Sequence, residues 1–281
     1  MAFPADARAP PELLKLAKAD FRTVIPELDI NTALSSPPFV KISGTFNARD
    51  LGLVPGSPIR PCFAFRSALL HGLDARGKTV LARELGIKKV FDLRSEQERT
   101  TEPDPVLPGV ENVWLNVNDD DPPLDVGSFV AGVGEEGYRR HYLGLLEGYE
   151  LIIKAILQHV RDKPEEPFLF HCTLGRDRTG IIAGLLMSLA NASSDTISLD
   201  YLLTRVGSEP RRERLMAHAL KETGCIDSDP GFCNLCNLHE NSWGAFVQEV
   251  QSKYDSFEGY AMQRLGFSME DIIEIRGNLC T

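Results

Sequence analysis

Short apolar runs rich in β-branched and aromatic residues recur through the first 170 residues of the chain. Each run is bounded by Gly, Pro, Ser or charged residues, as is typical of buried β-strands. The pattern predicts strands at residues 39–42, 62–65, 89–93, 110–115 and 167–170.

Apolar residues spaced three and four positions apart dominate the second half of the chain, which indicates helices. They predict helices at residues 75–85, 138–160, 179–191, 197–205, 211–222, 246–265 and 269–276. Residues 1–36 hold one amphipathic stretch followed by turn-rich sequence, and we interpret them as an N-terminal arm. Short strands followed by mostly helices predict one α/β domain over residues 37–281, with a central sheet flanked by helices and a helical C-terminal half.

The composition is that of an ordinary globular protein large enough to bury a single core. The chain has 281 residues, 43% of them hydrophobic, and a net charge of −10. Such a charge argues against nucleic acid or an anionic membrane surface as the main partner. The longest apolar run, residues 181–190, is too short to span a bilayer, and the N-terminus lacks a signal-peptide pattern. We therefore expect a cytoplasmic protein, whose oligomeric state the sequence leaves open.

The chemically most informative segment runs from His171 to Gly180 and has the sequence His-Cys-Thr-Leu-Gly-Arg-Asp-Arg-Thr-Gly. It lies where a predicted strand gives way to a predicted helix, so its backbone N–H groups and the helix dipole form an anion cradle. Cys172 lies at the base of this cradle, where the dipoles and Arg178 lower a cysteine pKa from about 8.5 to roughly 3.5–7.5. Arg178 also offers a planar fork for two phosphate oxygens. The sequence therefore predicts a cysteine nucleophile aimed at phosphorus.

This segment resembles the signature loop of the cysteine-dependent protein tyrosine phosphatase superfamily. An Asp directly before the signature Arg is similar to the loop of a bacterial and fungal subgroup, which usually has Lys where this chain has Arg176. Further segments resemble that subgroup at residues 46–52, 65–68, 91–95, 200–204 and 265–268, so the resemblance extends from about residue 38 to the C-terminus.

The resemblance implies a phosphatase that hydrolyses phosphate monoesters through a phosphocysteine intermediate, without cofactor or metal. It implies that Cys172 attacks phosphorus and that Thr179 hydrogen-bonds the thiolate and helps it leave in the second step. The phosphate is expected to bind to Arg178 and to the backbone of the loop. The remaining loop residues expected at the substrate are Thr173, Leu174, Gly175 and Arg176.

Asp92, at the end of a predicted strand, has two interpretations. By resemblance it would lie near the cradle and orient Arg178 or a water molecule. Alternatively, it pairs with Arg94. Arg49 and Asp50 are as consistent with a structural ion pair as with substrate contacts, and His171 is expected to hold the cysteine through hydrogen bonds.

The proton for the leaving oxygen has two candidate sources. The resemblance favours Asp177, inside the signature loop, as the general acid. The alternative is the acidic run Asp119, Asp120 and Asp121, which follows a predicted strand in a loop-like segment. Many phosphatases of the superfamily take their acid from such a loop.

The substrate class remains open at this stage. Phosphotyrosine is the default of the family, dual specificity extends it, and phosphoinositides or small-molecule phosphates and diphosphates are alternatives. Partners are thus a phosphorylated protein, lipid or small molecule. Two other classes of function compete: a phosphate-binding module without turnover, and a zinc-stabilised interaction protein.

The zinc hypothesis rests on Cys225, Cys233, Cys236 and His239, whose spacing matches no common finger pattern. We favour a loop of free thiols there. Cys62 falls in a predicted strand and is expected to be buried. Only one residue follows Cys280, so it forms no lipidation box.

Overall fold

A five-stranded sheet forms the centre of the protein, which was examined as a computed structural model that describes residues 10–115 and 124–281. The order of its strands is β1-β2-β5-β3-β4. Strand β5 is central and parallel to both neighbours, β2 and β3, while β1 is antiparallel at one edge. The strands span Arg49–Asp50 (β1), Ala64–Ser67 (β2), Lys89–Asp92 (β3), Glu111–Val113 (β4) and Phe168–His171 (β5).

The carboxyl ends of the three middle strands meet at one edge of the sheet. His171, the last residue of β5, is in register with Ser67 at the end of β2 and with Asp92 at the end of β3. Ligands of parallel sheets bind at this edge because the loops that leave the strands converge there. The register therefore places Cys172, which directly follows β5, at the binding edge.

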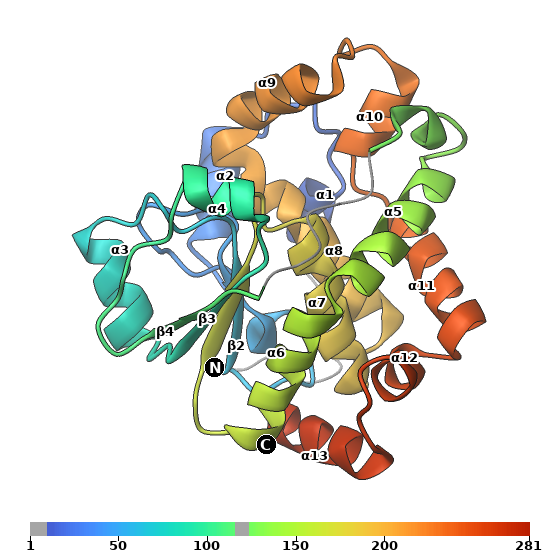
Figure 1. Ribbon diagram of the computed structural model, residues 1–281. Helices are drawn as coiled ribbons and strands as arrows, with labels where there is room; N and C mark the ends of the chain where they lie inside the picture. Colours follow the sequence, from blue (N-terminus) through green and yellow to red (C-terminus); the bar gives the residue numbers. More distant parts are fainter. Residues whose placement is uncertain (1–9, 116–123) are drawn as a thin grey trace.

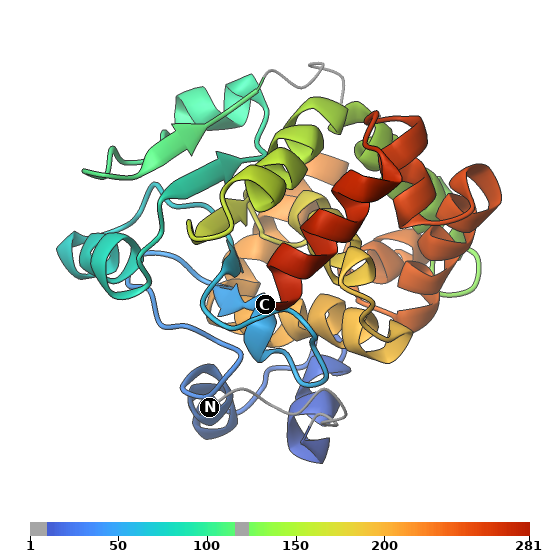
Figure 2. The ribbon, with the colours of Figure 1, turned by 90° about the horizontal axis from the view of Figure 1, so that it is seen from below.

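Most of the helices cover one face of the sheet, as Figures 1 and 2 show. The helices before β4 are α1 (Pro11–Ala17), α2 (Glu27–Leu34), α3 (Ala75–Thr79) and α4 (Glu96–Thr101). After β4 come α5 (Glu135–Gly148), α6 (Glu150–Asp162), α7 (Asp177–Leu189), α8 (Ser194–Ser208), α9 (Arg212–Thr223), α10 (Pro230–Cys236), α11 (Glu240–Tyr254), α12 (Phe257–Gln263) and α13 (Met269–Cys280). Helices α1 and α2 pack against α8.

The alternation of side chains along the strands separates two cores. Phe168 and Phe170 point to the side that α5 to α8 and α11 to α13 fill, and they belong to the larger core. Leu169 points to the opposite side, where it packs in a smaller core with Val80 and Leu81, which follow α3. Among the described residues, no helix has both the length and the apolar character that crossing a bilayer requires.

The predicted α/β architecture is confirmed, and four of the five predicted strands are present with shifted ends. The prediction of a strand at 39–42 is wrong. Phe39 and Ile42 are buried, but the backbone makes only an isolated bridge from Phe39 to Arg49, and the strand forms at Arg49–Asp50 instead. The expected burial of Cys62 is also wrong. It is exposed in a turn with φ +63°, before β2 begins.

Two predicted helices are each divided in two. The helix predicted at 138–160 breaks between Gly148 and Glu150, and the one at 246–265 breaks at Asp255, which has φ +66°. Helices α2, α4 and α10 were not predicted. The division into an arm over residues 1–36 and a domain over 37–281 stays a prediction.

Helix α7 packs so closely against α11 that it requires glycine at position 184. A Cβ atom there would lie 2.3 Å from Cζ2 of Trp243, which is 2% exposed. We expect Gly184→Ala to lower the free energy of unfolding by about 1–3 kcal/mol, measured by urea denaturation, because the indole has no room to move.

Gly244→Ala in α11 is the matched control, since a Cβ atom there meets nothing within 4 Å. It should raise stability by about 0.5–1 kcal/mol, because alanine favours a helix more than glycine does. Equal effects of the two substitutions would contradict this account of the packing.

Candidate active site

The signature segment forms a loop between the end of β5 and the start of α7 (Figure 1). Cys172 is 2% exposed at the base of this loop. Gly175 has φ +63°, and a Cβ atom there would lie 2.4 Å from the carbonyl oxygen of Ser67. Only glycine fits this close approach of the loop to β2. The 13-residue helix α7 directs the positive end of its dipole at the loop.

Side chains from outside the loop hold its carbonyl groups. Asn47 Nδ2 donates to the oxygen of Gly175 at 2.9 Å and to that of Leu174 at 3.2 Å. Arg66 Nη2 donates to the same Gly175 oxygen at 2.7 Å. Because these carbonyls bond away from the loop centre, the N–H groups of the loop are available to an anion.

A fully buried ion cluster fixes the residues that hold the loop. Asp200 on α8 accepts hydrogen bonds from Arg49 Nε at 2.7 Å and from Arg66 Nη1. Arg49 Nη1 also donates to Asn47 Oδ1 at 2.6 Å. Burial raises the pKa of Asp200, and the two guanidinium groups outweigh this effect, so the net pKa lies below its usual value. Arg49 is thus in a structural ion pair, but its partner is Asp200 and not Asp50, whose carboxylate accepts the N–H groups of Gly52 and Cys62.

Arg178 is held by Glu98 of α4, a residue that the sequence analysis did not single out. Arg178 Nη1 lies 2.5 Å from Glu98 Oε2, and Nη2 lies 2.8 Å from Oε1. Thr173 also donates to Glu98. Burial raises the pKa of Glu98, but the bonds and charge of Arg178 outweigh it and lower the pKa to about 2. A capping box, formed by Ser95 and Glu98, starts α4 and was the available sequence signal.

Asp177, the first residue of α7, is held by two partners. Its Oδ1 accepts a hydrogen bond from the Tyr142 hydroxyl at 2.7 Å and another from Arg176 Nε at 2.9 Å. The Tyr201 hydroxyl lies 2.8 Å from that of Tyr142 and donates to it, because the Tyr142 proton is directed at Asp177. Burial raises the pKa of Asp177, and Arg176, His141 and Tyr142 together bring it below its usual value.

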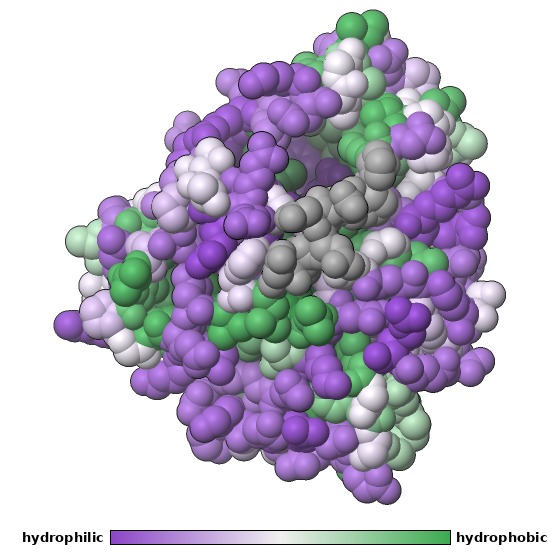
Figure 3. Space-filling view, in the orientation of Figure 1, coloured by the Kyte–Doolittle hydropathy of each residue, from purple (hydrophilic) through white to green (hydrophobic). Residues whose placement is uncertain are grey.

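The other expected residues of the segment have different surroundings. Thr179 is fully buried, and its Oγ1 has no hydrogen-bond partner among the described residues. Leu174 and Arg176 line a cavity of about 100 Å³ together with residues of α8 and α9 and with Cys236. Figure 3 shows that polar residues cover most of this side of the molecule and that the surface is hollowed below α9.

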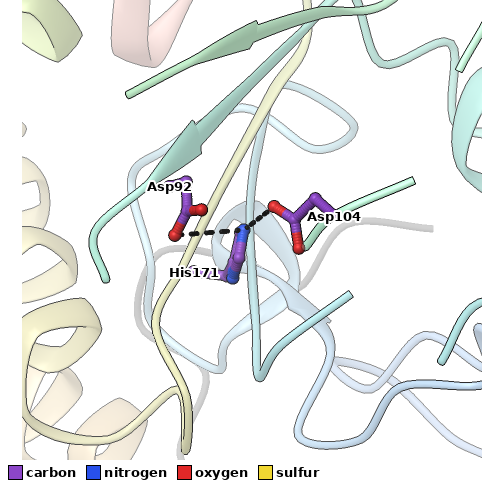
Figure 4. A group of neighbouring side chains, drawn as sticks. All are labelled: Asp92, Asp104 and His171. Carbon is purple, nitrogen blue, oxygen red and sulfur yellow. Dashed lines mark hydrogen bonds and ion pairs between the residues drawn. The ribbon is translucent and has the colours of Figure 1, made fainter. Parts of the chain in front are cut away.

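Asp92 adopts the second of its two expected arrangements. Its carboxylate accepts hydrogen bonds from Arg94 Nε at 2.9 Å and from Arg94 Nη2 at 2.8 Å. It also faces His171, which bonds to Asp104 (Figure 4). The ligand atoms of Asp92, Asp104 and His171 lie within 4.8 Å of one another, and Arg94 donates to both carboxylates of this group.

The structure thus brings the eight expected residues of the loop and the first turn of α7 together: Cys172, Thr173, Leu174, Gly175, Arg176, Asp177, Arg178 and Thr179. The alternative acids Asp119, Asp120 and Asp121 lie outside the described residues. The four residues of the zinc hypothesis are not assembled. Within residues 10–115 and 124–281, the one group of three or more close potential ligands is the Asp92 group, and Cys225, Cys233 and Cys236 are free thiols.

Comparisons with known proteins show the family of the chain. A family model described as "Tyrosine phosphatase family" matches residues 40–281. The tyrosine-protein phosphatase of Nostoc commune is 28% identical over 236 residues, which cover 78% of this chain and 75% of that protein. The triple specificity protein phosphatase PtpB of Mycobacterium tuberculosis is 27% identical over 283 residues, which cover 85% of this chain and 98% of that protein.

Among solved structures, the Siw14 catalytic core aligns with 55% of this chain and 86% of its own, at 16% sequence identity and a TM-score of 0.29. The family model, by contrast, runs from the first strand region through the last helix and includes the whole signature loop. The chain therefore belongs to the tyrosine phosphatase family and is a phosphatase.

Proposed function

We propose that the protein hydrolyses phosphotyrosine and related phosphate monoesters in two steps, with Cys172 as the nucleophile. One observation carries the proposal: Cys172 is buried at the end of the central strand, beneath the N-terminus of α7, in the same loop as a guanidinium that Glu98 holds in place. A thiolate in such a position is stabilised by the helix dipole and the adjacent cation.

Among the described residues, the bonds of Arg178 to Glu98, Leu93 and Tyr149 use Nη1 and one hydrogen of Nη2. A guanidinium has five N–H groups, so the edge formed by Nε and Nη2 remains for two phosphate oxygens. Glu98 would thereby fix the plane of Arg178 while the loop N–H groups bind the remaining oxygens.

In the first step, the Cys172 sulfur forms a bond to phosphorus and the bond from phosphorus to the ester oxygen breaks. Asp177 gives its proton to that oxygen. In the second step, Asp177 accepts a proton from water, the water oxygen bonds to phosphorus, and the thiolate leaves. The unpartnered hydroxyl of Thr179 is available to donate a hydrogen bond to the departing sulfur.

The substrate itself would protonate Asp177. The pKa of Asp177 lies below its usual value, so the group is ionised at neutral pH. A phosphate dianion next to this carboxylate raises the pKa of Asp177, because two like charges disfavour each other. Proton uptake on binding would then prepare the acid only when substrate is present.

The relative named as a triple specificity phosphatase makes substrates beyond phosphotyrosine a natural extension, whether phosphorylated proteins, lipids or small molecules. The mechanism requires neither metal nor cofactor. All six cysteines are free thiols. Because a reactive thiol is most easily kept reduced in the cytoplasm, we infer a cytoplasmic location.

Replacing the nucleophile tests the central step. We expect Cys172→Ser to lower kcat for p-nitrophenyl phosphate by about 10⁴-fold or more, because removing a nucleophile costs losses of this order or greater. The wild-type rate should persist in excess EDTA. An inactive wild type, or a Cys172→Ser variant with the wild-type rate, would instead favour a phosphate-binding module without turnover.

The acid assignment predicts a dependence on the leaving group. Asp177→Asn should lower kcat by about 10²–10⁴-fold for phenyl phosphate, which leaves poorly without a proton. The loss should be much smaller for p-nitrophenyl phosphate, whose anion leaves readily. Asp195→Asn, in the exposed first turn of α8, is the matched control and should change neither rate.

The same two substrates distinguish Asp177 from the alternative acids in the acidic run. If Asp119→Asn, Asp120→Asn or Asp121→Asn produces the selective loss and Asp177→Asn does not, the acid lies in the acidic run.

The pair between Glu98 and Arg178 predicts a pH dependence of stability. The folded-state pKa of Glu98, about 2, lies below its ordinary value of 4.5. The pair therefore stabilises the fold fully above pH 4.5, and this contribution is lost as the pH falls toward 2. We expect Glu98→Gln to cost about 2–3 kcal/mol at pH 7 and progressively less from pH 4.5 to pH 3, measured by urea denaturation.

Glu96→Gln in the same turn of α4 is exposed and should change stability by less than about 0.5 kcal/mol at every pH. A cost of Glu98→Gln that does not change with pH would mean that the carboxylate acts through packing rather than charge.

A further inference from the structure

A buried cluster of ionisable side chains lies directly behind the nucleophile, at the carboxyl edge of the sheet (Figure 4). His171 ends β5, Asp92 ends β3, and Asp104 comes from the segment that follows α4. His171 is 0% exposed, and the Asp104 side chain is 3% exposed. The mechanism proposed above uses none of these groups.

From this arrangement we propose that Asp104 is a positioning residue that holds His171 as a doubly protonated imidazolium behind Cys172. The inference rests on Cys172 being the nucleophile. It adds a residue from a distant segment, Asp104, to the groups that determine how readily this cysteine ionises.

The hydrogen bonds of His171 support the imidazolium form. Nε2 lies 2.8 Å from Asp104 Oδ2, and Nδ1 lies 3.3 Å from the carbonyl oxygen of Cys172. Both oxygens are acceptors. A neutral imidazole carries one N–H donor, whereas the imidazolium carries two. Only the doubly protonated ring donates to both partners, so the geometry favours a positive charge on His171.

The charges of the buried cluster around His171 sum to zero only when the His171 ring is doubly protonated. Asp92 and Asp104 carry two negative charges, and Arg94, which donates to both carboxylates, carries one positive charge. An imidazolium at His171 makes this buried group neutral, whereas a neutral ring would leave one uncompensated carboxylate, which is costly in a buried site.

The charged groups further from the ring do not change this balance. Arg99 lies 3.8 Å from Asp92, and its side chain is 47% exposed, so solvent screens its charge. On the other side of the loop, Glu98 and Arg178 neutralise each other.

The position of Asp104 is itself fixed. Arg94 Nη2 donates to Asp104 Oδ1 at 2.8 Å, while Asp104 Oδ2 accepts from His171. Burial lowers the pKa of His171, but Asp104 and Asp92 outweigh this and raise it above its usual value. Burial raises the pKa of Asp104, and His171 and Arg94 outweigh it in the opposite direction. A raised pKa for His171 and a lowered pKa for Asp104 are the shifts expected of an ion pair.

The consequence for the nucleophile is electrostatic. The Nδ1–H group of His171 donates to the Cys172 carbonyl, so the positive ring is fixed beside the residue whose sulfur must lose a proton. A nearby cation favours the thiolate form of a cysteine. A neutral His171 would remove that contribution, and Cys172 would then ionise at higher pH.

The direct test is nitrogen NMR of the His171 ring in the full-length wild-type chain. We expect both ring nitrogens to carry protons at pH 7.5. In Asp104→Asn, His171 should lose one proton at that pH, because the carboxamide accepts a hydrogen bond but carries no charge. Asp104→Glu should restore the doubly protonated signal. A neutral tautomer in the wild-type protein would overturn the proposal.

Asp92→Asn is the matched control. It removes the same charge from the same cluster at a distance of 3.8 Å from Nε2, and it leaves the 2.8 Å bond to Asp104 in place. We expect the doubly protonated form of His171 to persist to a higher pH in this variant than in Asp104→Asn, because the hydrogen bond to the charged Asp104 carboxylate remains. If Asp92→Asn and Asp104→Asn have equal effects, the general field of the cluster, and not Asp104, controls the ring.

The second readout is the pH dependence of Cys172 alkylation by iodoacetamide, followed by mass spectrometry of its peptide. Asp104→Asn should move the midpoint of this profile upward by about one pH unit, the scale of a neighbouring charge. In a His171→Gln background, Asp104→Asn should cause no further movement, since its effect passes through the ring. A shift that persists in this background would overturn the proposal.

The NMR and alkylation measurements do not depend on catalytic activity. The proposed nucleophile fails if Cys172→Ser remains active, whereas the role of Asp104 fails in the NMR and alkylation experiments. The two failures are therefore distinguishable.

Discussion

The carbonyl oxygen of Gly175 is the point on which the site depends. A loop that presents its N–H groups to an anion must direct its carbonyl groups elsewhere, and a buried carbonyl needs a partner. Asn47 and Arg66 provide that partner from the β1–β2 side of the sheet. Asp200 in turn holds Arg66 from α8, so the Gly175 oxygen connects the loop to β2, to the segment before β1 and, through Arg66, to α8.

Two buried charge clusters thus lie on opposite sides of the signature loop. One contains Arg49, Arg66 and Asp200, and the other contains Asp92, Arg94, Asp104 and His171. Buried ion pairs seldom add much net stability, but loss of one partner leaves an uncompensated charge and is costly. We interpret the two clusters as interactions that hold the loop in one geometry. Because each charge needs its partner, few substitutions of the clustered residues would be tolerated.

The sequence was sufficient where the signal is local. The signature loop between β5 and α7 was placed correctly because an apolar strand, a glycine-containing turn and an apolar helix follow one another within about 20 residues. The break at Gly148 was not predicted because the apolar periodicity continues through it. The strand at 39–42 was predicted wrongly because an apolar run can be buried without pairing in a sheet.

Contacts between residues far apart in the sequence could not be predicted from local sequence patterns. Glu98 lies 80 positions before its partner Arg178, and Asp104 lies 67 positions before His171. Nothing in the sequence next to either carboxylate identifies these partners. For Glu98, the capping-box pattern with Ser95 could have indicated the start of α4, but it says nothing of the guanidinium that the carboxylate meets. Asp200 was seen only as part of a segment with a family resemblance, whereas its two arginine partners follow from tertiary structure.

The hydroxyl groups of Tyr201 and Tyr142 form a hydrogen-bonded chain that ends at Asp177. The ten-residue signature segment would therefore not reproduce the whole site if it were moved to another protein. Trp243 of α11 packs at 5.2 Å against the Tyr201 ring and at 6.2 Å against the Tyr142 ring, measured between centroids. The C-terminal helices therefore determine where the hydrogen-bond donor of the carboxylate stands. A loop of the same ten residues grafted onto another strand and helix would retain the thiol and the guanidinium, but its carboxylate would lack this hydroxyl partner. The complete site accordingly requires the aromatic packing of Trp243, Tyr142 and Tyr201 together with the loop.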